Sequence, residues 1–143
     1  MIKRFFAPGN DPALTSLALL VLRLWLGLSM FFIHGLDKLE HYNAMAAHFA
    51  NPIGIGVKPS LILVIIAEVG GAWLLTLGLL SRLGALMLAI DMGVAFFAFH
   101  KMALSTGPHP GDLPFVYLAG FVTLLLAGPG KFSLDRALFG KGK

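Results

Sequence analysis

Four long apolar stretches dominate the sequence and restrict the folds open to it. They cover residues 14–33, 61–80, 83–99 and 113–128. A helix that spans a bilayer needs about 20 mostly apolar residues, so three stretches are long enough or nearly so, and the fourth is shorter. We expect an all-α polytopic membrane protein with a single membrane domain over residues 1–143. Its four transmembrane helices should form a bundle, with bounds of about 14–36, 59–80, 83–104 and 113–128.

Composition supports this class and excludes several others. The chain is 57% hydrophobic and 13% charged, whereas a soluble domain has roughly 25% charged residues. It contains no cysteine, which excludes disulfides, thiolate metal ligands and iron–sulfur clusters. The net charge of +4 comes mostly from residues near the chain ends. This distribution fits orientation in a membrane, and we expect no nucleic-acid partner.

Lysine and arginine residues are divided unequally between the two sides of the expected bundle. The side with both termini has Lys3, Arg4, Arg82, Lys131, Arg136, Lys141 and Lys143. The other side has Lys38, Lys58 and Lys101. Because cytoplasmic segments carry the excess of positive charge, the sequence predicts a multi-pass protein of a bacterial-type inner or plasma membrane with both termini in the cytoplasm.

Helix-capping and helix-breaking residues mark the ends of the stretches. Asp11 or Thr15 can cap the first helix, and Pro59 suits the first turn of the second. We expect a tight turn around residues 81–82 between the second and third helices. Residues 128–130, Gly-Pro-Gly, should end the fourth.

Residues 37–50 form a segment of a different kind. Apolar and aromatic side chains recur there at helical spacing, at Leu39, Tyr42, Met45 and Phe49. His41 and His48 fall together on another face. This pattern predicts a short amphipathic helix between the first two transmembrane helices, lying at the membrane surface or over the mouth of the bundle. A connecting role is favoured over that of a lid.

Three of the apolar stretches each contain one ionisable residue: Arg23, Glu68 and Asp91. A charge in the bilayer core costs roughly 2.5–3.5 kcal/mol and usually faces the bundle interior. At about 1.5 Å of rise per residue, the three lie at similar depth. We therefore expect a structural ion pair between Arg23 and Asp91, with Glu68 nearby. Either the cluster only fixes helix register, or it lines a cavity in which Glu68 moves a proton or binds a polar head group.

A second polar group lies near the outer ends of the helices. His34 and Asp37 fall within about 40° of Arg23 around an ideal helix, next to Lys38. His100 comes nine residues after Asp91, on the opposite side of an ideal helix, so it either faces another neighbour or the helix is distorted. His34 and His100 at similar depth could also ligate haem iron axially, a less favoured alternative. No metal site is expected otherwise.

Several of these residues occur in an order that resembles the DoxX family. Residues 23–27 (RLWLG) followed by 34–39 (HGLDKL) resemble its first helix. Residues 68–71 (EVGG) and 77–82 (LGLLSR) resemble its second helix and turn, and 128–135 (GPGKFSLD) resemble its ending. The resemblance covers nearly the whole chain. It implies a four-helix membrane protein, in a family some of whose members are linked to quinone-coupled oxidation or to thiol-stress complexes.

The leading functional hypothesis is a membrane subunit that binds a quinone or similar lipophile and supports a membrane oxidoreductase system. Glu68 and His34 are the candidate catalytic residues. The candidate ligand-binding residues are His34, Asp37, Lys38, Glu68, His100 and Lys101. Membrane lipids, a redox partner subunit and further copies of the chain are the partners that this hypothesis considers. The alternatives are a non-catalytic scaffold or accessory subunit, and a carrier of a small hydrophobic ligand. The hypothesis does not say whether the protein catalyses a reaction alone.

Overall fold

The computed structural model describes residues 11–104 and 110–140, and every regular element in this part of the chain is a helix. The first span consists of α2 (Pro12–Ser29), η1 (Met30–Gly35) and α3 (Leu36–Glu40), and the second of α5 (Val57–Ile65), η2 (Ile66–Gly71) and α6 (Ala72–Leu77). The third consists of α7 (Ser81–Gly93) and η3 (Val94–Phe99), and α8 (Asp112–Ala127) is the fourth. Two short helices, α4 (Tyr42–Met45) and α9 (Leu134–Phe139), lie outside the spans.

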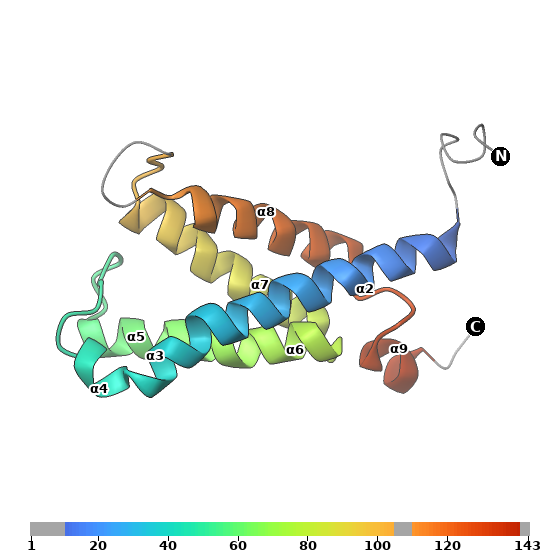
Figure 1. Cartoon of the computed structure of the whole chain (residues 1–143), viewed down its shortest axis with the longest axis horizontal. Coiled ribbons are helices and arrows are strands. Elements are labelled where there is room, and N and C mark those ends of the chain that lie inside the picture. The colour runs from blue at the N-terminus through green and yellow to red at the C-terminus, as the bar shows by residue number, and fades with distance from the viewer. Residues whose placement is uncertain (1–10, 105–109, 141–143) are drawn as a thin grey trace.

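The expected all-α membrane architecture is confirmed. The first three spans are long and apolar enough to cross a bilayer, and α8 is a shorter apolar helix. Figure 1 shows the start of α2, the turn from α6 to α7, and α9 gathered at one end of the bundle. The segment with α4 and the start of α5 lies at the other end (Figure 1).

The helix ends follow from local sequence. Asp11 is the cap of α2, because its Oδ1 accepts a hydrogen bond of 2.8 Å from the backbone N–H of Ala13. Pro59 lies in the first turn of α5, as predicted. The third span ends at Phe99 rather than at 104, because Lys101 and Met102 have positive φ angles, of 50° and 59°.

The turn between the second and third spans lies earlier than the sequence predicted. Gly78 and Leu80 are both in the left-handed conformation, with φ of 69° and 45°, and Ser81 already begins α7. Gly78 is required here for a second reason. A Cβ on it would lie 2.7 Å from Nη1 of Arg23 and 2.7 Å from Cβ of Ser133. The turn therefore packs directly against the first span and the C-terminal segment.

Arg23 is bound by this C-terminal segment and not by Asp91, so the predicted ion pair is wrong. The guanidinium donates hydrogen bonds from Nη1 to the carbonyl of Pro129, at 2.7 Å, and from Nη2 to that of Phe132, at 2.6 Å. Arg23 is 2% exposed. The prediction failed because similar depth fixes one coordinate only, and because residues 129–132 fold back against the bundle where the hydropathy pattern shows only an end.

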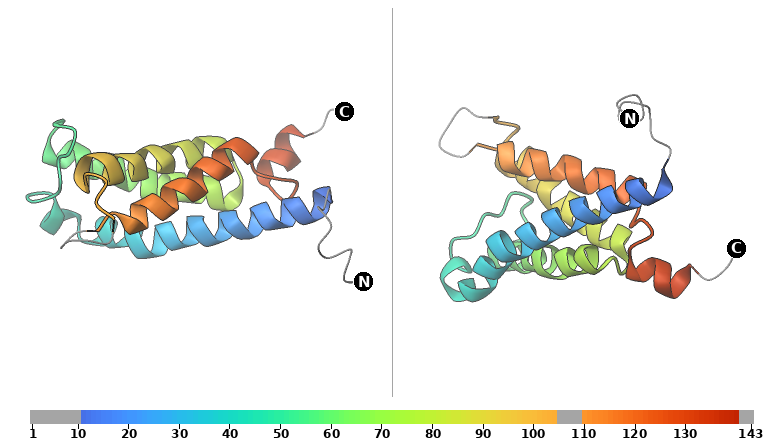
Figure 2. Two further views of the ribbon diagram at one scale, coloured as in Figure 1. Left: turned by 90° about the horizontal axis from the view of Figure 1, so that it is seen from above. Right: turned by 45° about the vertical axis from the view of Figure 1, so that its right-hand side comes forward.

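The segment expected to be one amphipathic helix is mostly irregular. Its first residues belong to α3, which continues the first span, and α4 is a single turn. His41 interrupts the helix, with φ of −99° and ψ of 20°. Apart from α4, the chain from there to Gly56 forms turns and bends, and it lines a common cavity with the second and third spans. The second and third spans are close together near Gly84 and diverge toward the other end, as Figures 1 and 2 show. Residues 41–56, the connector between the first two spans, lie at that end.

Candidate functional site

A cavity of about 1120 Å³ lies where the second and third spans diverge. One wall comes from α5 and η2, the opposite wall from α7 and η3, and the connector between residues 41 and 55 covers one side. The connector is fixed to α5 through Asn51, whose Oδ1 accepts hydrogen bonds from Ser60 Oγ at 3.2 Å and from the Gly56 N–H at 3.0 Å. The cavity is thus large enough for a drug-sized or larger ligand.

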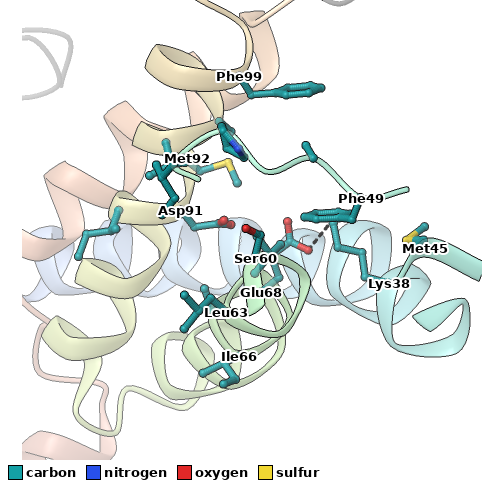
Figure 3. Close-up of a pocket in the computed structure, with 18 of the residues that line it drawn as sticks. Lys38, Met45, Phe49, Ser60, Leu63, Ile66, Glu68, Asp91, Met92 and Phe99 are labelled. Carbon is teal, nitrogen blue, oxygen red and sulfur yellow. Dashed lines mark hydrogen bonds and ion pairs between the residues drawn. The ribbon is translucent and has the colours of Figure 1, made fainter. Parts of the chain in front are cut away.

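A buried ion pair lies in the cavity wall. Lys38 Nζ is 2.7 Å from Glu68 Oε2, and the dashed line in Figure 3 marks this ion pair. The exposed fractions of the two side chains are 17% and 4%. Lys38 Nζ also lies 3.4 Å from the carbonyl oxygen of His34. The pair joins the end of the first span to η2 of the second. Because both groups line the cavity, they are at once a structural contact and a polar surface open to a ligand.

Asp91 faces the same region from the third span. Figure 3 shows its carboxylate pointing toward Ser60 and Glu68 across the cavity. Its Oδ2 is buried, and no residue of the described chain forms a hydrogen bond with it. Buried polar atoms almost always have a partner, so an exception calls for an explanation. With Glu68, Asp91 makes two carboxyl groups beside one ammonium group.

The rest of the lining is largely apolar and includes Met92, Phe49 and Phe99. Leu63 and Ile66 of the second span and Ile90 of the third line the cavity and are also 54%, 50% and 59% exposed. These side chains lie on membrane-spanning elements, where the exposed surface meets lipid. The cavity therefore opens toward the hydrocarbon between the two spans.

Three π-helical segments, η1, η2 and η3, interrupt the first three spans. A π-turn adds one residue relative to α-geometry, so it rotates everything beyond it by about 100°. Nine α-helical steps would put His100 opposite Asp91, but with one step absorbed in η3 the two fall within about 80°. His100 and Asp91 accordingly line one cavity. The predicted alternative of a distorted helix is the one the structure shows.

Comparison with known proteins agrees with this architecture. The DoxX family model matches residues 18–101, which is more than half of the chain. The chain belongs to the DoxX family. A protein of Haemophilus influenzae described as uncharacterized is 28% identical over 116 residues, which cover 78% of this chain and 84% of that protein. No solved structure gives a significant match.

The family match contains every charged side chain of the cavity in this DoxX protein. Asp37, Lys38, Glu68 and Asp91 all lie within residues 18–101. So does Arg23, but the carbonyl groups that bind it, of Pro129 and Phe132, lie beyond the match. The cavity of the DoxX region and the fold-back at the C-terminus are therefore separate features.

The structure brings together some predicted site residues and separates others. Asp37, Lys38, Glu68 and His100 line the cavity, as does Asp91. His34 and Lys101 are not among its lining residues. The His34 ring packs edge-on against Tyr117 of α8, with 5.8 Å between ring centroids. The haem alternative required both rings on one iron, and this arrangement does not place His34 in the cavity of His100.

Two further histidines line the cavity without having been proposed as site residues. His41 and His48 come from the connector, and His41 Nδ1 lies 3.1 Å from Asp37 Oδ1. Their common helical face was visible in the sequence, and it was assigned to a surface helix. Among the described residues, no group of three or more His, Cys, Asp or Glu side chains could hold a metal ion.

Proposed function

We propose that this DoxX protein binds a membrane-soluble ligand with a polar head group, a quinone or a similar lipophile, between its second and third spans. In this role it is a subunit that supports a membrane oxidoreductase system. The observation that carries the proposal is a large, mainly apolar cavity that opens toward lipid and contains Lys38, Glu68 and Asp91. Such a site accepts an apolar tail and fixes a head group by a few polar contacts.

The quinone class fits the site for chemical reasons. A quinone ring is flat and apolar with an oxygen at each end, and the aromatic side chains of Phe49 and Phe99 line the cavity. Lys38 Nζ can donate a hydrogen bond to a ring oxygen, and the carboxyl groups of Glu68 and Asp91 can exchange protons with it. A bound quinone would supply electron-transfer chemistry that the chain, with no cysteine, does not supply through thiols or iron–sulfur clusters.

A purely structural scaffold is the main alternative. Two charged groups do have structural partners. Arg23 bonds the C-terminal carbonyls through Nη1 and Nη2, with its Nε left unbonded in the described chain, and Lys38 bonds Glu68. Asp91 does not fit this explanation, because its buried Oδ2 contributes no hydrogen bond to the described fold. A buried carboxyl oxygen without a hydrogen-bond partner costs stability. A role of Asp91 in binding a ligand would explain why a carboxyl group occupies this position.

The test is binding of decylubiquinone to the purified full chain in detergent. Ala95→Trp should fill the cavity, because Ala95 lines it from η3, and should weaken binding at least tenfold, or about 1.4 kcal/mol. Phe97→Trp is the control, since Phe97 lies on the same segment, is 57% exposed and does not line the cavity. No binding by the wild type, or equal binding by Ala95→Trp, would contradict the proposal.

Two single substitutions separate this site from the one predicted by sequence. Glu68→Gln removes the charge that faces Lys38 and should weaken binding about tenfold or more. His34→Ala should leave binding nearly unchanged, because His34 packs on α8. If His34→Ala abolishes binding and Glu68→Gln does not, the ligand lies elsewhere.

A further inference from the structure

Among the charged groups of the cavity, carboxyl groups outnumber ammonium groups, and His41, His48 and His100 also line it. Glu68 and Asp91 present carboxyl oxygens from two spans, while Lys38 is the cation in contact with either of them within the described chain. Lys38 Nζ already lies 2.7 Å from Glu68 and 3.4 Å from the His34 carbonyl. One of the three N–H groups of the Lys38 ammonium remains for a ligand. The acceptor capacity of Asp91, in contrast, is unused at Oδ2.

We propose that the cavity selects lipophiles whose head group donates a hydrogen bond, and that Asp91 is the group that accepts it. This inference rests on the proposed function and specifies the chemistry of its ligand. For the quinone class, it means that the site binds the reduced hydroquinone in preference to the oxidised quinone. A hydroquinone has a hydroxyl group at each end of its ring, whereas a quinone has only acceptors there.

The positions of Asp91 and Lys38 support a site in which Asp91 accepts a hydrogen bond from the ligand. Asp91 points across the cavity toward Glu68 and Ser60, so a head group placed between the second and third spans would meet its carboxylate directly (Figure 3). Ser60 Oγ donates its hydrogen bond to Asn51 and is not the missing donor. A ligand hydroxyl can donate to Asp91 and accept from Lys38 through the same oxygen atom. A ligand carbonyl would leave ionised Asp91 without a partner, and its own lone pairs would face the carboxyl oxygens of Glu68 and Asp91.

Anionic head groups are disfavoured by the same imbalance. A fatty-acid carboxylate or a phosphate would enter a cavity lined by three carboxyl groups, those of Asp37, Glu68 and Asp91, and one ammonium group. Like charges in a site of low dielectric repel strongly. The rim of Leu63, Ile66 and Ile90 admits an acyl chain. The contacts of the head group with the charged side chains, and not the tail, therefore decide which membrane lipophiles bind.

The experiment compares three ligands with one ring and one tail: an alkyl hydroquinone, its quinone, and its dimethyl ether. The ether has the hydroquinone oxygens but no donor, and it cannot be oxidised under the conditions of the assay. Binding to the full-length protein in detergent is measured anaerobically. We expect the hydroquinone to bind at least tenfold more tightly than either of the others. Such a preference would raise the potential of the bound two-electron couple by about 30 mV.

Asp91→Asn provides the second arm. Its amide keeps the shape of the carboxyl group but can donate a hydrogen bond, so the preference for the hydroquinone should fall at least tenfold. Glu40→Gln is the matched control, because Glu40 is exposed at the end of α3 and does not line the cavity. It should keep the wild-type preference. Melting temperatures of both variants establish that they fold.

The outcomes separate the two proposals. Equal affinity of the wild type for all three ligands overturns donor selection but leaves the proposed quinone-class site standing. A preference that persists undiminished in folded Asp91→Asn shows that another group accepts the hydrogen bond and overturns the role of Asp91. Failure of the wild type to bind any of the three contradicts the proposed function and the inference together.

Discussion

Individual charged residues of this protein serve distinct purposes even though several lie at similar depth. Arg23 is nearly completely buried and bonds two carbonyl groups that follow α8. Hydrogen bonds from a charged donor contribute roughly 1.5–3 kcal/mol each. Asp91 lies in a cavity, where its Oδ2 has no partner within the described chain. Arg23 thus contributes to stability, and Oδ2 of Asp91 is available to bind a ligand.

This difference predicts how substitutions of the two residues combine. Arg23→Leu should lower the free energy of unfolding by about 2 kcal/mol or more, because it leaves the Pro129 and Phe132 carbonyls unbonded. Asp91→Leu should cost little or be stabilising, since it removes a buried carboxyl oxygen that has no hydrogen-bond partner in the described chain. The double variant should show the sum of the two effects, measured as melting temperatures in detergent. A double variant more stable than this sum would instead support the Arg23–Asp91 ion pair that the sequence predicted.

Asp135 provides a pH-dependent contact at the same end of the bundle. Its Oδ1 accepts a hydrogen bond of 2.6 Å from the Leu80 N–H, and its Oδ2 accepts from the Ser81 N–H and hydroxyl. Partial burial raises the pKa of Asp135, but these hydrogen bonds and the charge of Arg23 lower it more, so its net pKa lies below the ordinary value. The ionised form therefore stabilises the folded state.

The sign of the pH effect follows from this lowered pKa. The stabilisation is present above the unfolded-state pKa of about 3.9 and is lost as pH falls through the folded value. Wild type should melt above Asp135→Asn at pH 6, and the difference should shrink as pH falls toward 3. Glu40→Gln, at an exposed carboxyl group, is the comparison. A difference that stays constant with pH would show that the charge of Asp135 contributes nothing.

At the scale of helices, the second and third spans pack tightly at one end so that they can diverge at the other. A Cβ on Gly84 would lie 2.6 Å from the carbonyl oxygen of Gly71 and 2.9 Å from the backbone nitrogen of Leu75. These are backbone atoms and cannot move aside like a flexible side chain. Gly84 thus sets the close approach from which the two helices separate toward the cavity.

Two glycines of α7 give a matched prediction. Gly84→Ala should cost about 1–3 kcal/mol by overpacking, because the helices must separate. Gly93→Ala should be neutral or stabilising, since nothing lies within 4 Å of the position that the added methyl group would take, and alanine favours a helix by about 1 kcal/mol over glycine. Thermal unfolding of both variants in detergent is the measurement. Equal melting temperatures would contradict the role given to Gly84.

Helix geometry also explains which parts of the site were predictable. Lengths of apolar sequence predict the spans, and the depths of Glu68 and Asp91 follow by counting residues. Directions around the helix do not follow, because η1, η2 and η3 each shift the register. No residue pattern indicated η1 or η2, and the spacing of Asp91 and His100 offered a distorted third helix only as one of two alternatives. Asp37, predicted on the Arg23 face, lies beyond η1 and lines the cavity instead. Lys38 and Glu68 were both named, but their pairing was not.

At the scale of the whole molecule, the described ends of the chain share one side of the bundle. The start of α2 and the short helix α9 lie together with the turn from α6 to α7 (Figure 1). On the opposite side, Lys38 pairs with Glu68, so its charge is compensated in the folded protein. The positive residues thus remain concentrated on the side of α9, where Arg82, Lys131 and Arg136 lie.

This asymmetry predicts that the side of α9 faces the cytoplasm, because positive residues flanking spans are retained there. A reporter that is active only in the cytoplasm should be active when fused after Lys143, and a reporter that requires export should be active when inserted near His48. His48 belongs to the connector that lines the cavity, so the cavity would then lie in the outer half of the bilayer. As a control on the cause, replacing Lys131 and Arg136 with Gln should reduce the proportion of molecules in this orientation. Activity of the exported reporter after Lys143 would reverse the orientation and place the cavity on the cytoplasmic side.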